Sequence, residues 1–181
     1  MKWLSKKEKI GLESFRQSKD RFFTRDTHSP LTEEQKRCFT GLKYFPWNPE
    51  MRFELSIQTL PVREQISIQT TSGVVRYYNR AGKIEFEVEN QAAELTVYQN
   101  GDGFFLPFID SLAGLDTYPA GRYLDPHLLA DGKILIDFNM AYNPYCAYND
   151  LYSCPLSPPE NRLVVPIRAG EKIPEGDWVH S

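Results

Sequence analysis

The sequence has few cysteines, no long apolar run and little net charge. Its three cysteines, Cys38, Cys146 and Cys154, are too few for a disulfide framework and fit a reducing compartment better. No apolar run approaches the roughly 18 residues of a membrane span, and no apolar segment follows the first lysines as it would in a signal peptide. We therefore expect a cytoplasmic protein with no membrane partner.

Several common functional motifs are also missing. The sequence has no glycine-rich phosphate loop between a strand and a helix, no nucleophile elbow and no metalloprotease helix. The formal net charge of −3 gives no strong attraction for nucleic acid. These absences argue against the common nucleotide-binding and serine-hydrolase classes, and we expect no nucleic-acid partner.

The small net charge hides an uneven distribution. Residues 1–25 hold eight Lys or Arg and three acidic residues, so the other residues hold thirteen basic and twenty-one acidic ones. A basic N-terminal helix that lies on an acidic body explains this distribution most simply. An arm for nucleic acid or a membrane is the alternative.

Residues 5–25 predict a helix with one apolar-rich face. A second, short helix is expected to begin near Ser29 and Pro30, with Ser29 or Thr32 as its cap, and to stop before Gly41. Four residues of the first helix fall at three- and four-residue steps and so share its face: Leu12, Phe15, Lys19 and Phe22.

Alternation of apolar and polar residues indicates strands through the middle of the chain. The clearest case is Ile84, Phe86 and Val88, which alternate with glutamates, and Gly82 before them predicts a bulge or turn. A turn is also expected at Asn90-Gln91. Further strand-like segments are 51–57, 66–70, 74–78, 95–98, 104–108, 121–125, 133–138 and, as a last edge strand, 163–167.

Many short strands with turns between them predict a mainly β fold. We expect an antiparallel β-barrel or sandwich, with one or two N-terminal α-helices and a long ordered C-terminal coil. A length of 181 residues suits one domain over 1–181. Its parts would be an N-terminal helical segment at 1–40, an antiparallel β body at 50–140, an ordered polar coil at 141–170 and a tail at 171–181, with the polar run from Ala169 leading into the tail.

Five motifs spread along the chain resemble a known family. They are Phe39-x-Gly-Leu-x-Tyr-Phe-Pro46, Gly121-Arg-Tyr-Leu-Asp125, Asp137-Phe-Asn-x-Ala-Tyr-Asn-Pro-x-Cys-Ala-Tyr148, Cys154-Pro-Leu-x-Pro-Pro-Glu-Asn-Arg-Leu163 and Ala169-Gly-Glu-Lys172. Together they resemble a bacterial and archaeal family defined as a domain of unknown function. Ser157 departs from the pattern, which more often has proline there. The resemblance implies a stand-alone domain and brings no activity with it.

The stretch from Asp137 to Arg162 is the predicted functional region. It is rich in Tyr, Asn and acidic residues, which no regular helix or strand combines in this way. Its prolines would stiffen the coil, as the wall of a pocket requires. We expect a ligand pocket there, with contacts from Arg122, Tyr123, Asn139, Tyr142, Asn143, Tyr148, Asn161 and Arg162.

The two cysteines of this stretch are eight positions apart, and two packed, reduced thiols are the preferred interpretation. A disulfide would need Cα atoms within roughly 7 Å, which a looping coil could allow. A nucleophilic Cys146 activated by His127 is a further alternative. A zinc site would need closer pairs of ligands, so we expect no metal site, and nothing in the sequence calls for a cofactor.

Asp137 and Glu160 are the acid–base candidates of this region, and Cys146 is the nucleophile candidate. Arg122 or Arg162 could hold the anionic group of a substrate. In the alternative interpretation, Asp and Asn side chains of the coil satisfy backbone amides in a buried network.

Three functions therefore stay open, and whether the protein is an enzyme is undecided. The preferred one is a small-molecule-binding β-barrel or sandwich with its pocket at the 137–162 coil. The second is a hydrolase- or lyase-type enzyme that uses carboxylate acid–base chemistry and arginine contacts to an anion. The third is a structural or protein-interaction domain.

Overall fold

The computed structural model describes residues 5–59, 64–101 and 103–176. Within these ranges the fold is mainly β, as predicted, with two antiparallel sheets and two α-helices. In chain order the elements are α1 (Ser5–Arg25), α2 (Glu33–Cys38), η1 (Pro49–Met51), β1 (Arg52–Leu55), β2 (Gln65–Gln69), β3 (Val75–Val88), β4 (Gln91–Asn100), β5 (Gly103–Phe108), β6 (Arg122–Leu124), β7 (His127–Leu128), β8 (Ile134–Asp137), η2 (Phe138–Met140), η3 (Tyr145–Ala147) and η4 (Pro159–Asn161).

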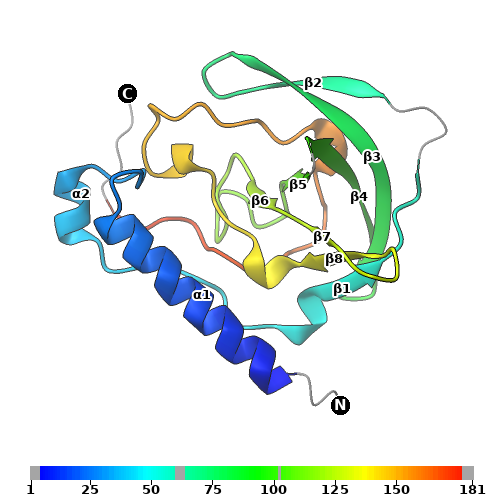
Figure 1. Cartoon of the computed structure of the whole chain (residues 1–181), viewed down its shortest axis with the longest axis horizontal. Helices are drawn as coiled ribbons and strands as arrows, with labels where there is room; N and C mark the ends of the chain where they lie inside the picture. Colours follow the sequence, from blue (N-terminus) through cyan, green and yellow to red (C-terminus); the bar gives the residue numbers. More distant parts are fainter. Residues whose placement is uncertain (1–4, 60–63, 102, 177–181) are drawn as a thin grey trace.

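The strands form a five-stranded sheet in the order β2-β3-β4-β5-β6 and a three-stranded sheet in the order β1-β8-β7. Neither sheet closes on itself. Of the two predicted architectures, the structure therefore has the sandwich and not the barrel. Figure 1 shows β3 curving around one side of the molecule, α1 along the opposite flank, and the C-terminal coil running between them. The coil is thus placed where helix and sheet could both contribute to a site.

The long hairpin of β3 and β4 is the centre of the larger sheet. Its two-residue turn is Glu89-Asn90, one position earlier than expected, and both residues have positive φ angles of 51° and 63°. Two consecutive positive φ angles are typical of the turn type that matches the twist of paired strands. The register shifts between Arg80 and Gly82, which confirms the predicted bulge. The bulge lets β3 continue as one bent strand through two predicted segments.

The main core lies between the two sheets. Ile84 and Leu95 of the larger sheet are fully buried, as are Ile134 and Ile136 of the smaller sheet, and all four belong to one cluster. The alternation seen in the sequence explains this arrangement, because residues two apart point to the same face of a strand. Apolar residues of the C-terminal coil, Val165, Ile167 and Ala169, complete the cluster.

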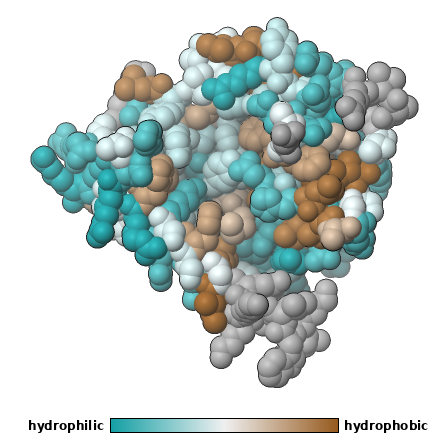
Figure 2. Space-filling model, in the orientation of Figure 1, coloured by the Kyte–Doolittle hydropathy of each residue, from teal (hydrophilic) through white to brown (hydrophobic). Residues whose placement is uncertain are grey.

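Helix α1 packs on the coil through a face close to the predicted one. Leu12 and Phe23 are buried, Lys19 and Phe22 are half-buried, and Phe15 is 43% exposed. Phe23, not Phe22, is therefore the deepest residue at the end of the helix, where it contacts Leu31 and Tyr148. Side chains on the outer side of α1 and α2 are largely hydrophilic, whereas hydrophobic ones gather over the strands (Figure 2).

Helix α2 begins at the later of the two predicted starts. Thr32 is its N-cap: its hydroxyl accepts a hydrogen bond from the Gln35 amide, and the Gln35 side chain accepts one from the Thr32 amide. This reciprocal capping box outweighs the signal of Pro30, which precedes the helix. The helix ends at Cys38, two residues before Thr40, the last residue that a stop at Gly41 predicts.

Two predictions for the C-terminal region are wrong in part. Leu163–Ile167 forms no strand, although Leu163 N donates to the Ile109 carbonyl (2.7 Å) and Ser111 N to that of Val165 (3.2 Å). The polar run from Ala169 is not a loose tail, because Ala169 and Glu171 are 0% and 1% exposed. This run pairs with the segment that follows α2: Phe45 N donates to the Gly170 carbonyl (2.9 Å) and Lys172 N to that of Lys43 (2.8 Å).

Among the described residues, no helix combines the length and the apolar character that a membrane-spanning helix needs.

Candidate functional site

The larger sheet contributes three aromatic rings, in contact one after the other, to one wall of a pocket. Tyr78 of β3 stacks on Phe105 of β5 with ring centroids 5.3 Å apart, and Phe105 meets Tyr123 of β6 edge to face at 4.9 Å. In the sheet β4 lies between β3 and β5, and β6 lies next to β5, so the rings come from three separate parts of the sequence. Aromatic pairs in such geometries form a stable, well-ordered surface.

The opposite wall is built by the C-terminal coil, which hydrogen bonds hold against the sheet. Tyr123 and Tyr142 exchange two backbone hydrogen bonds of 2.8 and 2.9 Å. Further along, Thr71 N donates to the Cys154 carbonyl (2.9 Å) and Leu156 N to the Gln69 carbonyl (2.8 Å). The coil thereby brings further side chains to the pocket: Tyr142, Pro144, Tyr145, Tyr152, Ser153, Cys154 and Pro155.

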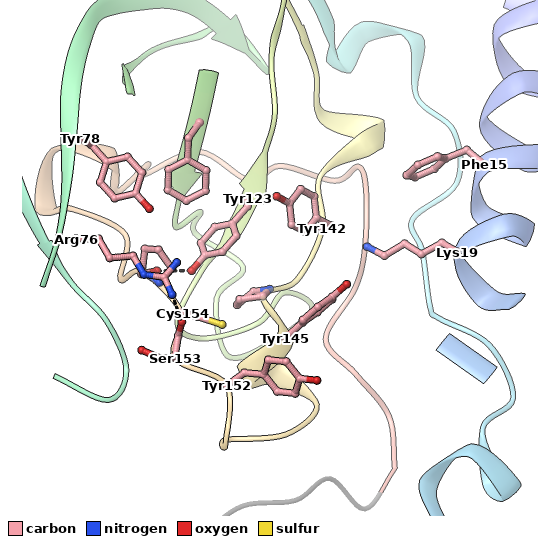
Figure 3. Close-up of a pocket in the computed structure, with 13 residues that line it drawn as sticks. Phe15, Lys19, Arg76, Tyr78, Tyr123, Tyr142, Tyr145, Tyr152, Ser153 and Cys154 are labelled. Atoms are coloured by element: carbon pink, nitrogen blue, oxygen red, sulfur yellow. Dashed lines mark hydrogen bonds between the residues drawn. The ribbon is translucent and has the colours of Figure 1, made fainter. Parts of the chain in front are cut away.

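Helix α1 closes the third side with Phe15 and Lys19, which reach toward the rings (Figure 3). The Lys19 ammonium lies 4.8 Å from the centre of the Tyr142 ring and 2.5 Å from a Glu171 carboxylate oxygen. Glu171 is 1% exposed, and its other oxygen accepts hydrogen bonds from the Asn143 amide (2.8 Å) and the Tyr148 hydroxyl (3.2 Å). The buried carboxylate therefore connects the helix, the coil and the C-terminal segment.

The resulting cavity has a volume of about 570 Å³. Its charged lining residues among those described are both basic, Lys19 and Arg76. Arg76 Nη2 donates to the Ser153 carbonyl (3.0 Å), which holds the guanidinium against the coil (Figure 3). Burial raises the pKa values of Tyr123 and Tyr142 above the ordinary value of tyrosine, so both hydroxyls stay protonated. The pocket is thus aromatic, neutral at its hydroxyls and positively charged at two side chains.

Cys146 and Cys154 meet behind this aromatic surface, and both are free thiols. The Cys146 amide N lies 3.4 Å from the Cys154 sulfur and donates to it. Hydrogen bonding from the Cys146 thiol, and then from the backbone amides of Cys146 and Tyr145, outweighs burial and lowers the pKa of Cys154. The charge of Arg76 acts in the same direction. The pKa of Cys146 is raised by its interaction with Cys154 and by burial. Cys154 is the member of the pair that lines the cavity.

A second cavity of about 390 Å³ adjoins the first and shares Phe15 and Tyr142 with it. Its lining includes Asp125, His127 and Asp137. The Tyr142 hydroxyl donates to Asp125 (2.9 Å). Asp137 accepts hydrogen bonds from the amide N (3.0 Å) and the side chain (2.9 Å) of Asn139, so Asp137 caps the η2 turn.

The other carboxylate candidate, Glu160, lies in a different place. It lines a third cavity of about 390 Å³ between β2 and residues 156–160. One Glu160 oxygen accepts hydrogen bonds from Arg80 Nη2 (2.6 Å) and the Tyr98 hydroxyl (2.9 Å). The lining residues of this cavity and of the Asp137 cavity do not overlap, so the structure does not bring the two predicted acid–base residues together.

Two predicted arginine contacts also lie away from the aromatic pocket. Arg122 is 1% exposed, and its guanidinium donates to the backbone carbonyls of Ile167, Ala169 and Glu171 at 2.5–2.9 Å. Burial lowers the pKa of Arg122 to about 10, and Asp110, at 3.6 Å, opposes this shift. Arg162 is exposed and is absent from the lining of the three cavities above.

The predicted asparagines are buried and bonded to the protein. Asn139 exchanges two hydrogen bonds of 2.8 Å with the backbone of Asn48. Asn143 donates to the Tyr148 hydroxyl (3.2 Å) and the Lys172 carbonyl (2.8 Å), and Asn161 bonds the backbone of β4 and β5. These contacts match the buried network that the sequence left open as an alternative.

Of the predicted ligand contacts, Tyr123 and Tyr142 line the aromatic pocket, and Tyr148 lies behind it beside Glu171. Sequence reasoning missed the sheet residues Tyr78 and Phe105, because only the strand order makes them neighbours of the coil. The spacing of α1 did predict that Phe15 and Lys19 share a face. The remaining missed lining residues are Arg76, Pro144, Tyr145, Tyr152, Ser153, Cys154 and Pro155.

Comparison with known proteins gives a family and a fold. The model of a family described as "Protein of unknown function (DUF1684)" matches residues 37–172. The chain is 32% identical to an uncharacterised protein of Haloarcula marismortui solved by solution NMR, with a TM-score of 0.71, and the match covers 95% of this chain and 97% of that one. No curated protein matches the chain. The family range contains the whole 137–162 coil but starts after α1.

Proposed function

The chain belongs to this family of unknown function, and we propose that it binds a small, flat, anionic molecule in the pocket between α1, the larger sheet and the coil. The observation that carries the proposal is the lining itself: six aromatic rings from sheet and coil, and a seventh from α1, surround one cavity of about 570 Å³. Ligand pockets in proteins commonly have volumes of about 300–1,000 Å³ and mostly apolar walls.

The shape of the lining supports a flat ligand. The rings of Phe105 and Tyr123 meet at an interplanar angle of 71°, and those of Tyr123 and Tyr142 at 88°. Rings held at right angles offer both faces and edges, so a planar guest can stack on one ring and touch the edge of the next. A conjugated or aromatic body fits this arrangement better than a branched aliphatic one.

The charge of the lining supports an anionic group on the ligand. Arg76 comes from the exposed part of β3, and its guanidinium has five N–H donors, more than its bond to Ser153 uses. A carboxylate or phosphate can accept two parallel hydrogen bonds from such a group. Lys19 adds a second positive charge on the helix side, although Glu171 partly neutralises it.

The enzyme alternative has less support. It called for Asp137 or Glu160 with Arg122 or Arg162, but neither arginine lines the cavity of either carboxylate, and Arg122 is engaged by backbone carbonyls. The scaffold alternative explains the buried asparagines equally well. It gives no reason for a cavity of this size between three elements, so we favour binding.

The proposal can be tested by a thermal-shift screen of the full chain against aromatic carboxylates and aryl phosphates. A ligand that binds only the folded state raises the unfolding midpoint, by about 2.7 kcal/mol of stability at a hundredfold excess over Kd. Arg76→Gln removes the proposed anion contact, and Phe15→Ala removes a ring from the lining. Tyr77→Ala and Ile10→Ala are matched controls, because both residues are exposed neighbours outside the lining.

The expected result is a hit whose Kd rises about tenfold or more in Arg76→Gln, since a hydrogen bond to a charged group contributes about 1.5–3 kcal/mol. Phe15→Ala should weaken binding severalfold, and both controls should bind as the wild type does. Hits that are equally affected by the control variants, or hits that Arg76→Gln binds as tightly as the wild type does, would contradict the proposal.

A further inference from the structure

Cys154 and Cys146 form a thiol pair on the wall of the proposed ligand pocket. The Cys154 sulfur lies 3.4 Å from the Cys146 amide N, so it is within about 5 Å of the Cys146 Cα atom. A sulfur this close to the backbone of its partner fits the short approach that a disulfide requires. Cys146 lies in η3 and Cys154 in the coil that follows it, so neither thiol is held in a strand.

The two thiols differ in access. Cys154 is 8% exposed and lines the cavity, whereas Cys146 is 4% exposed and is absent from its lining. Figure 3 shows the Cys154 sulfur beside the Tyr123 and Tyr145 side chains, on the same side of the pocket as Ser153 and Arg76. A reagent that enters the pocket therefore meets Cys154 first, with Cys146 directly behind it.

The surroundings of Cys154 favour the thiolate, which is the reactive form of cysteine. The Cys146 amide donates to the sulfur, and Arg76 provides a positive charge nearby. Cys38, the third cysteine, is exposed and has no such neighbours among the interactions that the structure shows. Cys154 is thus the activated thiol, and Cys146 is a second thiol close enough to react with it.

We propose that Cys154 reacts with organic hydroperoxides that enter the aromatic pocket, and that Cys146 then resolves the product into a Cys146–Cys154 disulfide. The substrate class rests on one part of the proposed function, the aromatic walls, which would select a hydroperoxide with an aromatic or apolar substituent. It makes no use of the anion contact of Arg76. The thiol pair itself rests on the geometry of the coil.

The chemistry balances in two steps. The Cys154 thiolate attacks the terminal oxygen of the hydroperoxide, the O–O bond breaks, and the alkoxide leaves and takes up a proton as an alcohol. Cys154 is now a sulfenic acid. The Cys146 thiol attacks that sulfur, an S–S bond forms, and water leaves. The pair has lost two electrons and two protons in total, and the hydroperoxide has been reduced to the alcohol and water.

The experiment treats the full, reduced chain with one equivalent of cumene hydroperoxide and follows each cysteine by mass spectrometry of the digested protein. We expect Cys154 to be oxidised at least tenfold faster than Cys38 in the same molecules, and a peptide pair linked through Cys146 and Cys154 to appear. Cys146→Ser should stop at the sulfenic acid, which dimedone traps at Cys154. Cys154→Ser should leave Cys146 reduced, and Cys38→Ser should react as the wild type does.

Oxidation of Cys38 before Cys154, or full oxidation without the linked peptide, would overturn the proposal. Equal rates with cumene hydroperoxide and hydrogen peroxide would overturn the substrate class. Circular dichroism of each variant shows whether it is folded, and the wild-type mapping does not depend on any variant. The readout is also independent of the ligand screen: a chain that binds aromatic anions but keeps Cys154 reduced contradicts only this inference. A chain that forms the disulfide but binds none of them contradicts only the ligand proposal.

Discussion

Asn161 provides the sharpest test of how the coil is held on the sheet. The pairing of β4 with β5 ends at Tyr98 and Phe105, and the same register would place Thr96 opposite Pro107. Proline has no N–H to donate, so a strand ladder cannot continue there. The Asn161 side chain fills this gap: its oxygen accepts from Thr96 N, and its nitrogen donates to the carbonyls of Thr96 and Pro107, all at 2.8 Å.

Replacing Asn161 with alanine removes all three bonds at a position that is 0% exposed. At about 1 kcal/mol of net stability for each bond, the loss is about 3 kcal/mol. The Thr96 N–H is left buried without an acceptor, which adds about 1 kcal/mol or more. We therefore expect Asn161→Ala to lower the free energy of unfolding by about 4 kcal/mol. For a protein of this size the melting midpoint should fall by about 10 °C.

Urea denaturation followed by tryptophan fluorescence measures the change, with Arg162→Ala as the matched control. Arg162 is the next residue but is exposed, so its variant should stay within about 0.5 kcal/mol of the wild type. A loss below 1 kcal/mol in Asn161→Ala, with an unchanged denaturant slope, would refute the view that this amide bridges the two strands. A ligand-binding role without a structural one would then return as an explanation for Asn161.

Three further predictions concern other contacts of the coil. Lys19→Met should lower the free energy of unfolding, measured by urea denaturation, by about 3 kcal/mol, because it leaves the Glu171 carboxylate, 1% exposed, without its cation. The double variant Lys19→Met/Glu171→Gln should recover part of this loss, and an unchanged urea midpoint in Lys19→Met would contradict the ion pair. Gly170→Ala should lower the free energy of unfolding by about 2 kcal/mol or more, since the new Cβ would lie 2.6 Å from the Ala141 carbonyl oxygen at a φ of +76°. An unchanged melting temperature would show that the segment can shift. The rate of Cys154 alkylation by iodoacetamide should rise with pH through a midpoint below the ordinary cysteine value of about 8.5, because the lowered pKa lets the thiolate form at lower pH. A midpoint at or above that value would contradict the proposed surroundings of the sulfur.

The strands were predictable where one face of the strand is buried and the other is exposed to solvent. Ile84, Phe86 and Val88 alternate with glutamates because β3 packs one side on the core, and this pattern is local in the sequence. Whether the strands close into a barrel or stay open depends on which strands pair, and local alternation carries no such information. The turn at Glu89-Asn90 was misplaced by one residue because Asn90 is a common turn residue in either position.

The candidate site was predictable in its location but not in its composition. A pocket was predicted at the coil because its Tyr and Asn residues suit neither helix nor strand, and Tyr142 lines the cavity. Tyr78 and Phe105 could not be assigned, since their approach to the coil depends on the order of strands in the sheet. Arg122 was predicted as a contact for a substrate anion, whereas its partners are backbone carbonyls that only the folded C-terminal segment brings together.

A flat anionic ligand in the aromatic pocket would change the surroundings of the backbone amides that line it. The most direct measurement is a two-dimensional amide NMR titration of the ¹⁵N-labelled chain with an aryl carboxylate or phosphate found in the screen. We expect shift changes concentrated at the amides of Arg76, Phe105, Tyr123, Tyr145 and Ser153, with little change in β1. Changes confined to residues 156–160 and β2, or a spectrum that no screened ligand alters, would contradict ligand binding in this pocket.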